Sequence, residues 1–335
     1  MTTVPTVSDP RTATDSAFPR DAPAGDQLRY MLNHAVLAPS VLNTQPWRFA
    51  VDGAEVRLTA DRTRQLRAVD PLGRDLAVSC GAALLNLRLA AGHYGYTAIV
   101  TLLPDPDDPD VLARLWLGPP GPASADDEAL FHAIAHRHTE HRPFGPDPVA
   151  PGGLAALRAE ARREGADLAV FEGPDETAAV AALVADAVRA QGADPAQRDE
   201  LRAWLRADRD PRPDGVPDAE QDAGGRHTGG RTPAGAYAAE TERLATASPA
   251  LVVVTTPQDD VASWLTAGQA LQRLLLRATL LGLSASFLNP AVEVDAVRER
   301  LARLTGEAFP QVVLRVGTPV PSRGTPRRRV SDVSS

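Results

Sequence analysis

The chain has few of the features that mark secreted, membrane-bound or nucleic-acid-binding proteins. Its 335 residues include a single cysteine, Cys80, which excludes an internal disulfide framework and fits a reducing cytoplasm. The formal net charge of −8 argues against general binding to nucleic acids or anionic membranes, although arginines gather locally between Arg323 and Arg329. The N-terminus has no basic region followed by an apolar core, so we expect no signal peptide.

Long apolar runs are also missing. The longest, near Ala270–Leu288, contains Arg273 and Arg277, so none reaches the length of a membrane span without a charge. Aromatic residues make up only 4% of the chain, but the 43% of hydrophobic residues can build a packed core. The length suits two ordinary domains or one duplicated domain. We therefore expect a cytoplasmic protein with neither a membrane nor a nucleic acid as its partner.

Turn residues and apolar spacing divide the rest of the chain into helices and strands. Residues 1–24 are polar and rich in Thr, Pro and Asp, which is typical of a disordered arm. Asp52-Gly53 between two apolar segments predicts a hairpin. The patterns predict helices at 25–37, 74–94, 125–136, 151–164, 174–191, 262–281 and 292–304, and strands at 48–51, 55–60, 97–103, 112–117, 251–256, 284–288 and 312–316.

Residues 192–236 differ from the rest in composition, because Pro, Gly, Asp and Arg dominate there. The segment is too polar to form a core element, and we interpret it as a long loop or lid with one helix at 197–207. Loops of this length inside a compact protein are usually functional or disordered. Its place relative to any binding site is not fixed by the sequence.

Two segments of the chain resemble each other. Residues 79–98 align without gaps on residues 266–285, and the matched positions include Gly81 with Gly268 and Gly95 with Gly282. Each copy is predicted to be a helix that ends at glycine and leads into a strand. Two Ala-rich helices can match by composition alone, but the paired glycines favour an internal duplication.

The most informative stretch is residues 39–49, which read PSVLNTQPWRF. Pro39 ends the preceding helix, since it lacks an N–H and restricts the residue before it. Ser40, Asn43 and Gln45 then lie on a turn with polar groups available to a ligand. The alternative is a helix-stop turn that carries only a buried Trp47.

A second polar motif lies mid-chain, where residues 137–144 read RHTEHRPF after an amphipathic helix. Arg137 can hold phosphate oxygens in a bidentate manner, and the Thr139 hydroxyl and His138 ring add donors. A solvated basic helix end is the alternative. No Cys/His spacing indicates zinc, and Ser40 has neither a G-x-S-x-G context nor a visible His/Asp partnership, which argues against a serine hydrolase.

These segments together resemble the nitroreductase superfamily, whose members bind FMN. Residues 39–47 match its P-S-x-x-N-x-Q-P-W motif and residues 137–144 resemble its R-[RH]-[ST]-x-R-x-F phosphate motif, with His141 where many relatives carry Arg. In ordinary members the second motif comes first, and a dimer completes each site. The order found here resembles the Acg-type branch, in which one chain is a fused, degenerate dimer. The resemblance implies one FMN site built from Ser40, Asn43, Gln45, Arg137, His138 and Thr139.

The resemblance implies further contacts with the cofactor. Residues 287–290, FLNP, stand where relatives present backbone N–H groups to the flavin; Pro290 has none, which leaves Leu288 and Asn289. Arg327 and Arg328 stand where relatives place a basic residue on the phosphate, and a solvated tail is the alternative. No side chain is expected to be catalytic, because the flavin carries the chemistry.

The expected architecture is therefore α+β, a nitroreductase-like fold duplicated in one chain, with two mainly antiparallel sheets and helices at a shared interface. Residues 25–122 form the first half and 123–330 the second, including the lid-like insertion 192–236. The implied function is an FMN-dependent NAD(P)H oxidoreductase that reduces a nitro, quinone or similar small acceptor. The alternative is a catalytically silent FMN-binding protein with an occluded site. The monomer is expected to bind FMN, and a homodimer is left open.

Overall fold

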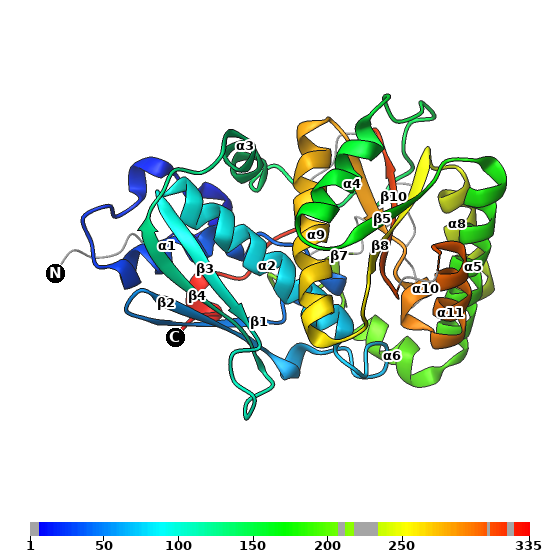
Figure 1. Cartoon of the computed structure of the whole chain (residues 1–335). Coiled ribbons are helices and arrows are strands. Elements are labelled where there is room, and N and C mark those ends of the chain that lie inside the picture. The colour runs from blue at the N-terminus through cyan, green and yellow to red at the C-terminus, as the bar shows by residue number, and fades with distance from the viewer. Residues whose placement is uncertain (1–6, 207–211, 218–233, 307–308, 320–324) are drawn as a thin grey trace.

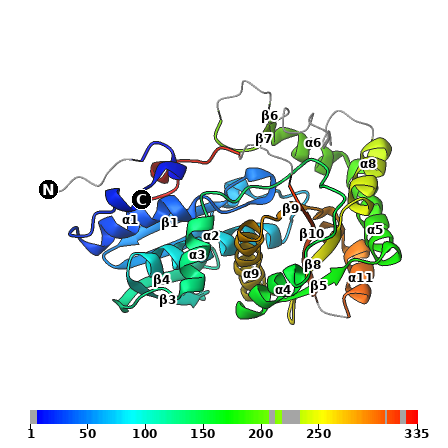
Figure 2. The same cartoon turned by 90° about the horizontal axis from the view of Figure 1, so that it is seen from above.

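The computed structural model describes residues 7–206, 212–217, 234–306, 309–319 and 325–335. The described chain contains two four-stranded sheets, one in each half, which are separated by a pair of long central helices (Figure 1). Seen from above, the N-terminal half and the C-terminal half lie side by side, and the C-terminal tail returns to the first half (Figure 2).

The first half has one sheet with helices packed on one of its faces. Gly53, with φ +54°, makes the predicted two-residue hairpin between the first two strands. Apolar side chains such as Leu28, Trp47 and Leu84 are buried between sheet and helices. The elements are α1 (Ala24–Ala35), β1 (Trp47–Asp52), β2 (Glu55–Ala60), α2 (Arg74–His93), β3 (Tyr96–Leu102) and β4 (Val111–Pro120), and the sheet has the antiparallel order β1-β2-β4-β3.

The second half has the same kind of sheet but helices on both of its faces (Figure 1). Its strand β8 is accordingly buried at every position. The sheet has the antiparallel order β5-β8-β10-β9. The elements are α3 (Ala125–Ala133), α4 (Gly153–Arg163), β5 (Asp167–Phe171), α5 (Pro174–Ala193), α6 (Pro195–Ala203), β6 (Leu205–Arg206), β7 (Val216–Pro217), α8 (Ala234–Thr246), β8 (Ala250–Thr256), α9 (Val261–Leu280), β9 (Ser284–Phe287), α10 (Pro290–Glu293), α11 (Asp295–Leu304) and β10 (Phe309–Gly317).

The two halves share one topology, which confirms the predicted fold class. Numbered within each half, both sheets have the strand order 1-2-4-3, and in both a long helix leads into the third strand. The predicted glycine stops follow α2 and α9, where Gly95 and Gly282 have φ values of +92° and +70°. Both values lie in the left-handed region that favours glycine at a helix end.

The matched glycines of the repeat hold the two halves together. A Cβ on Gly81 would lie 2.2 Å from the carbonyl oxygen of Leu265, and a Cβ on Gly268 would lie 2.0 Å from that of Val78. In the alignment Val78 corresponds to Leu265, so the two contacts are equivalent, as expected about a pseudo-twofold axis. The backbones of α2 and α9 can approach this closely only because both positions lack a side chain.

The interface between the central helices contains polar side chains as well as apolar ones. Gln272 donates a buried hydrogen bond of 2.7 Å to Asn86, and Glu164 pairs with Arg88 and Arg273. Buried amide groups need hydrogen-bond partners. In this pair Asn86 comes from the first half and Gln272 from the second. By length and composition α2 could cross a membrane, but it is mostly buried in the core, and central core helices meet the same criterion.

The prediction of a disordered arm at residues 1–24 is wrong for residues 7–24; residues 1–6 lie outside the described part of the chain. Phe18 is buried and stacks on Tyr94 with ring centroids 3.8 Å apart, and Thr14 exchanges two hydrogen bonds with Tyr30. A single aromatic side chain anchors a segment whose average composition is polar.

The boundary between the halves is also less simple than predicted. The C-terminal residues, assigned to the second half as far as 330, pair with β1: Phe49 N–H donates to Val333 at 2.8 Å, and Val333 is buried in the first core. Helix α3, beyond the predicted boundary at 122, buries Leu130 and Phe131 in that same core. Both connections tie the second half back onto the first.

Several elements differ from the sequence prediction. Strand β5 and helix α8 were not predicted, and the single helix expected at 292–304 is broken at Val294 into α10 and α11. Within 192–236, helix α6 begins two residues before the expected 197, because Asp194 caps it by accepting from Ala196 N–H. Residues 207–211 and 218–233 lie outside the described chain.

Candidate functional site

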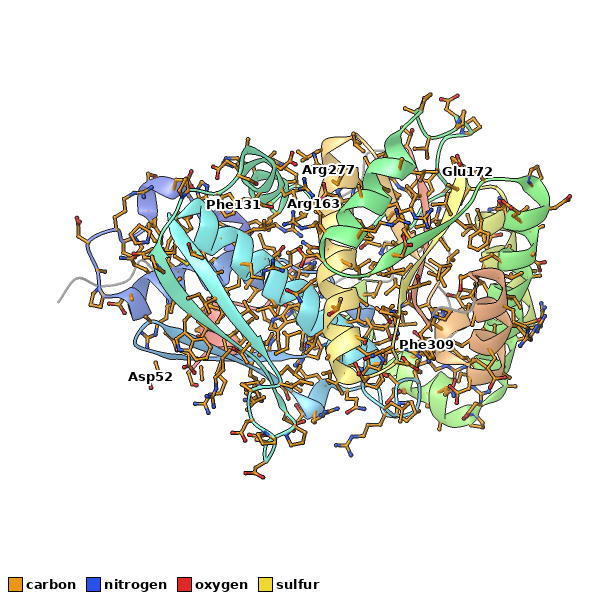
Figure 3. All side chains as sticks on the ribbon, viewed as in Figure 1. Asp52, Phe131, Arg163, Glu172, Arg277 and Phe309 are labelled. Carbon is orange, nitrogen blue, oxygen red and sulfur yellow. The ribbon has the colours of Figure 1, made fainter. Side chains whose placement is uncertain are left out.

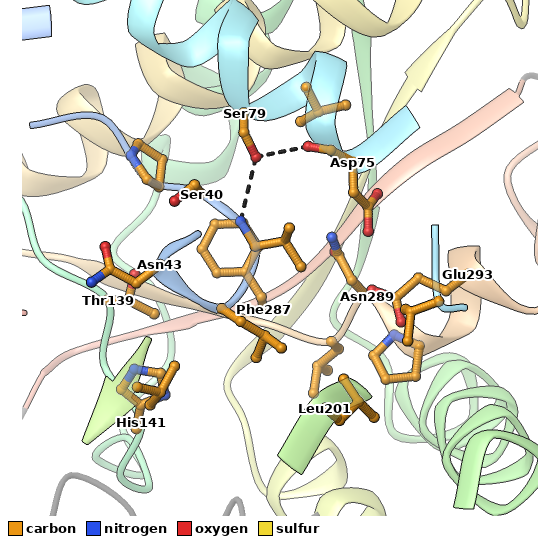
Figure 4. Close-up of a pocket in the computed structure, with 18 of the residues that line it drawn as sticks. Ser40, Asn43, Asp75, Ser79, Thr139, His141, Leu201, Phe287, Asn289 and Glu293 are labelled. Carbon is orange, nitrogen blue, oxygen red and sulfur yellow. Dashed lines mark hydrogen bonds between the residues drawn. The ribbon is translucent and has the colours of Figure 1, made fainter. Parts of the chain in front are cut away.

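A pocket of about 210 Å³ lies where the two halves meet. Its walls come from the turn at 39–43, the first turns of α2, the 139–141 segment, the loop after β9, and Thr325 and Arg327 near the C-terminus. Figure 4 shows Asn43, Thr139 and His141 toward one side of it and Asp75, Asn289 and Glu293 toward the other. The pocket therefore brings together segments that are far apart in the sequence.

The turn at 39–46 is held in an unusual conformation. Leu42, Asn43 and Gln45 have φ values of +44°, +54° and +50°, a region that costs free energy for residues with a side chain. Ser40 stabilises the turn by accepting a 2.9 Å hydrogen bond from Gln45 N–H. Ser40 and Asn43 both line the pocket, as predicted for ligand-binding residues.

Asn43 and Gln45 also hold other parts of the chain in place. The Asn43 amide donates to the carbonyls of Gly215 and Pro326, both at 3.2 Å, while its Oδ1 is buried with no partner among the described residues. Gln45 is fully buried, donates to Pro213 at 2.9 Å, and accepts from Arg328 N–H at 2.8 Å. Neither Gln45 nor Arg328 is among the pocket-lining residues. Both instead hold neighbouring segments of the chain together through their hydrogen bonds.

Arg137 lies two residues before the pocket-lining Thr139, but neither it nor His138 is itself among the pocket-lining residues. The Arg137 side chain is buried, and its Nε and Nη1 have no hydrogen-bond partner in the part of the chain that the structure describes. Burial lowers the pKa of its guanidinium to about 10, with the charge of Arg11 acting in the same direction. The group nevertheless stays charged at neutral pH. A buried, unpaired cation is costly, which indicates that the protein keeps it for an anionic partner.

The residues after Arg137 lead to the pocket wall. Thr139 lines the pocket and pairs with Ala285 in an isolated bridge. His138 is half-buried, and its Nε2 has no partner among the described residues. His141 also lines the pocket, and burial followed by the charge of Arg315 lowers the pKa of its imidazole to about 4, so it is neutral at pH 7.

The structure of the loop after β9 contradicts one predicted contact with the ligand. Leu288 N–H donates to Val313 at 2.8 Å, so it extends the sheet and cannot also serve a ligand in the pocket. Asn289 lines the pocket, and its side-chain oxygen accepts from Val313 N–H at 3.3 Å. Among the two predicted backbone donors, only Asn289 is left for that role.

Arg327 reaches the pocket from the C-terminal segment. It is buried, lines the pocket, and donates to the Thr325 hydroxyl at 2.6 Å. Arg11, from the ordered N-terminal arm, donates to the carbonyl of Thr325 at 3.0 Å. Because Arg11 also influences the pKa of Arg137, three arginines from distant segments make this region strongly cationic.

The opposite side of the pocket is acidic, which the sequence did not reveal. Asp75 and Glu293 both line it, Asp75 is almost fully buried, and Gln191 donates to Glu293 at 2.5 Å. Burial, then the charge of Asp75, raises the pKa of the Glu293 carboxyl well above its usual range. Glu293 therefore keeps its proton to a higher pH than an ordinary carboxyl does.

The predicted lid-like segment contributes directly to the pocket. Leu201, Leu205 and Val216 line it, and Tyr237 at the return of the segment does so too. Trp204 stacks under the guanidinium of Arg64, which also pairs with Asp214. The described part of 192–236 thus lies against the site, with one ordered stretch, 212–217, bonded to the Asn43 turn.

Comparison with known proteins places these features in a family. A Mycobacterium tuberculosis protein named "Putative NAD(P)H nitroreductase" is 35% identical over 93% of this chain and 92% of its own length. A second one from that organism, acg, with the same description, is 30% identical over 92% of this chain and 95% of its own length. The chain belongs to the nitroreductase family. Its relatives at this level include acg itself, which places it in the Acg-type branch.

Other comparisons add less about this nitroreductase-family chain. No protein-family model matches it. A nitroreductase with bound FMN from Bacteroides fragilis is 14% identical over 59% of this chain and 92% of its own, with a TM-score of 0.38. A nitroreductase-like protein from Bacillus cereus is 16% identical over 61% and 92%, with a TM-score of 0.37. Such TM-scores are too low to support a conclusion about the site.

Proposed function

We propose that this chain binds one FMN in the pocket between its halves and passes electrons from NAD(P)H to a small nitro, quinone or similar acceptor. The family supports the oxidoreductase class, since relatives with matching length are named NAD(P)H nitroreductases. When bound, FMN supplies the redox chemistry, and the protein contributes orientation and electrostatics.

The observation that carries the proposal is the buried, unpaired guanidinium of Arg137. Its Nε and Nη1 have no partner among the described residues, and a guanidinium is a strong hydrogen-bond donor to phosphate oxygens. Arg327 and Thr139 line the pocket, so a phosphate bound beside them would meet a cation and a hydroxyl, and Arg137 lies two residues before Thr139 in the chain. A neutral ligand would leave the Arg137 charge uncompensated.

The remaining walls suit a flat aromatic ring system. Apolar side chains from three segments line the pocket, among them Leu42 from the first motif, Val78 from α2 and Phe287 from β9. The Asn289 N–H and the Asp75–Glu293 carboxyl pair add polar contacts. Binding sites for small cofactors usually combine such an apolar lining with a few placed polar groups.

Titration with FMN tests the proposal. Arg137→Ala should weaken FMN binding by roughly 1–3 kcal/mol, the loss expected for a charge-assisted hydrogen bond. The matched control is Arg163→Ala, which removes the same charge from an exposed site on α4 that pairs with Asp126 (Figure 3). Equal affinities for the two variants would remove Arg137 from the phosphate site, and two FMN per chain would contradict a single pocket.

A silent FMN-holding protein is the second candidate, because one specific observation favours it. The 212–217 stretch is bonded to the Asn43 turn, and Leu205 and Val216 form part of the pocket wall. These residues, 205–206 and 212–217, form a cover over the pocket. A nicotinamide ring would have to displace this cover in order to stack on a flavin. Anaerobic mixing of FMN-loaded protein with NADPH, and separately with NADH, distinguishes the two: rapid bleaching of the flavin absorbance identifies the enzyme, and none identifies the holder.

The proposed site needs only one chain, because both motifs reach the same pocket. We therefore propose that the monomer binds FMN, whether or not two chains associate. Sedimentation of FMN-loaded protein at low concentration provides the measurement. Loss of FMN in step with dissociation of a dimer would contradict this part of the proposal.

A further inference from the structure

Two histidines and a glutamate converge at the far end of α2, away from the pocket. His93 is in the last turn of α2, and Glu128 and His132 are one turn apart on α3. One ligand-type atom from each of the three residues, His93, Glu128 and His132, lies within 4.8 Å of the other two. Nitrogen and carboxylate oxygen are the donor atoms that zinc takes in proteins.

The hydrogen-bonding capacity of His93 leaves one of its contacts unexplained. Its Nδ1 lies 2.7 Å from Glu128 Oε1 and its Nε2 lies 3.0 Å from Asp15 Oδ1. A neutral imidazole has one N–H and one lone pair, so it can donate to only one of these carboxylates. The other nitrogen then directs a lone pair at a carboxylate oxygen, which is unfavourable unless a cation, either a second proton or a metal ion, lies between them.

The arrangement around His93 matches that of a metal ligand. Its ring is nearly parallel to Phe131, with centroids 3.8 Å apart, so its orientation is fixed by packing. Metal-binding histidines usually donate their second ring N–H to a carboxylate, and Asp15 is placed to accept it. Nδ1 is then the free lone pair, and it faces the space shared with Glu128 and His132.

The distances leave room for an ion after small movements. Two ligands of a tetrahedral zinc site are about 3.3 Å apart. Glu128 Oε1 lies 3.2 Å from His132 Nε2, which is close to this separation, and 2.7 Å from His93 Nδ1, so Glu128 and His93 must separate slightly to admit the ion. Glu128 and His132 have side chains that are 40% and 58% exposed, so both can adjust and the ion can enter from solvent. A water would take the fourth position.

We propose that His93, Glu128 and His132 form a divalent metal site selective for zinc-like ions, with Asp15 as the outer carboxylate that orients His93. The ion would join three segments at one point: the ordered N-terminal arm, the C-terminal end of α2, and α3, whose Phe131 is marked in Figure 3. The site is independent of the proposed FMN pocket, so either can fail without the other.

Calorimetric titration of the full-length, chelator-treated protein with zinc chloride tests the site. We expect one zinc per chain, a zinc-dependent rise in the melting temperature, and at least a tenfold loss of zinc affinity in His132→Ala, whose side chain is too exposed to be needed for folding. Asp15→Asn should weaken zinc binding to a smaller extent. His136→Ala, an exposed histidine one turn further along, is the matched control and should bind zinc like the parent chain.

Cobalt(II) gives a second, independent signal, because its visible absorption reports ligand geometry. A tetrahedral-type spectrum that disappears in His132→Ala supports the site, and magnesium should not compete because it prefers oxygen ligands. Zinc affinity that is equal in the parent chain, His132→Ala and His136→Ala would overturn the proposal. So would the absence of zinc binding.

Discussion

The two halves of the molecule share a strand order and a central helix but use their extra residues differently. In the first half the connection from α1 to β1, residues 36–46, carries the ligand-binding turn, whereas the equivalent connection from α4 to β5 is only residues 164–166. In the second half the extra chain lies between β5 and β8, where the first half has the tight turn of Gly53 and Ala54.

This difference explains how unequal parts of the two halves build the pocket. The long turn of the first half meets the Arg137 segment and the β5–β8 insertion of the second, and all three line the same cavity. The pseudo-symmetric position has only the short 164–166 connection, and Glu164 there is committed to ion pairs with Arg88 and Arg273. The asymmetry lies in the connections, and the shared core stays symmetric.

The largest effect on stability should come from a substitution that forces α2 and α9 apart. Gly268→Ala places a Cβ 2.0 Å from the Val78 carbonyl oxygen, and a backbone carbonyl cannot move aside as a flexible side chain can. We expect a loss of about 3 kcal/mol in the free energy of unfolding, or failure to fold. Gly81→Ala should behave alike, because its Cβ meets the Leu265 carbonyl oxygen at 2.2 Å. Urea denaturation provides the measurement.

A matched control for these two variants lies in α2, the helix that contains Gly81. A Cβ on Gly92 would meet only Ala123, at 3.5 Å, which is ordinary contact. Gly92→Ala should therefore stabilise α2 by about 0.5–1 kcal/mol through helix propensity. If all three variants changed stability equally, the close approach of the two helices would not be what holds the halves together.

The starts of the two central helices offer a sharper comparison, because their acids behave oppositely. Burial, then the charge of Asp75, raises the pKa of Asp70 to about 6 before α2. Before α9, burial alone would raise the pKa of Asp259, but hydrogen bonds from Arg298, Trp264 and Gln311 hold it well below its usual range. The two acids should therefore give stability with opposite dependence on pH.

For Asp70, the folded state favours the protonated form, so its contribution to stability is complete below about pH 4 and is lost as the pH rises through about 6. The slope should be at most about 1.4 kcal/mol per pH unit. Asp70→Asn should remove this loss. Denaturation at several pH values from 4 to 8 checks it, and an unchanged slope would show that Asp70 is ionised in the folded protein throughout.

For Asp259 the sign is reversed. Its carboxylate stabilises the folded state above about pH 4, and this contribution disappears as the pH falls toward its lowered folded pKa. Asp259→Asn should be less stable than the parent chain at pH 7, and the difference should shrink in acid. A difference that is constant from pH 2 to pH 7 would point to lost packing instead of lost charge.

Much of the fold and part of the site could be predicted from local patterns. The Asp52-Gly53 turn and the two helix–glycine–strand repeats are encoded within short stretches of sequence, and both are confirmed. The 39–49 motif forms the expected turn, and its binding of a ligand stays a prediction. Strand β5 is short and its burial does not alternate, since only Leu168 and Phe171 are buried, so its pattern is weak. Phe18 helps to order the N-terminal arm by stacking on Tyr94, a contact that average composition hides.

The parts that could not be predicted depend on pairs of residues far apart in the chain. Asp75 and Glu293 are separated by most of the molecule, and each is unremarkable in its local sequence. The His93, Glu128 and His132 cluster likewise has no zinc-finger spacing, because it needs the packing of α3 on the end of α2. Local periodicity carries no information about which side chains meet across such a distance.

The smallest expected effect concerns the cover that only the second half has. Asp214 lies in the ordered stretch 212–217 and pairs with Arg64 of the first half, beside the ring of Trp204. Partly exposed ion pairs contribute about 0.5–1 kcal/mol, so Asp214→Asn should open the cover about two- to fivefold more often. If the pocket holds FMN and the cover limits access, flavin reduction by NADPH should accelerate by the same factor, as stopped-flow absorbance would show.

Hydrogen exchange at Gly215 N–H, which donates to the Asn43 carbonyl at 3.3 Å, reports the opening even without turnover. Asp199→Asn, in an exposed pair on α6 of the same insertion, is the control and should change neither rate. Faster exchange with an unchanged reduction rate would mean that the cover moves but does not limit access, and the reason for slow reduction would then lie in the pocket itself.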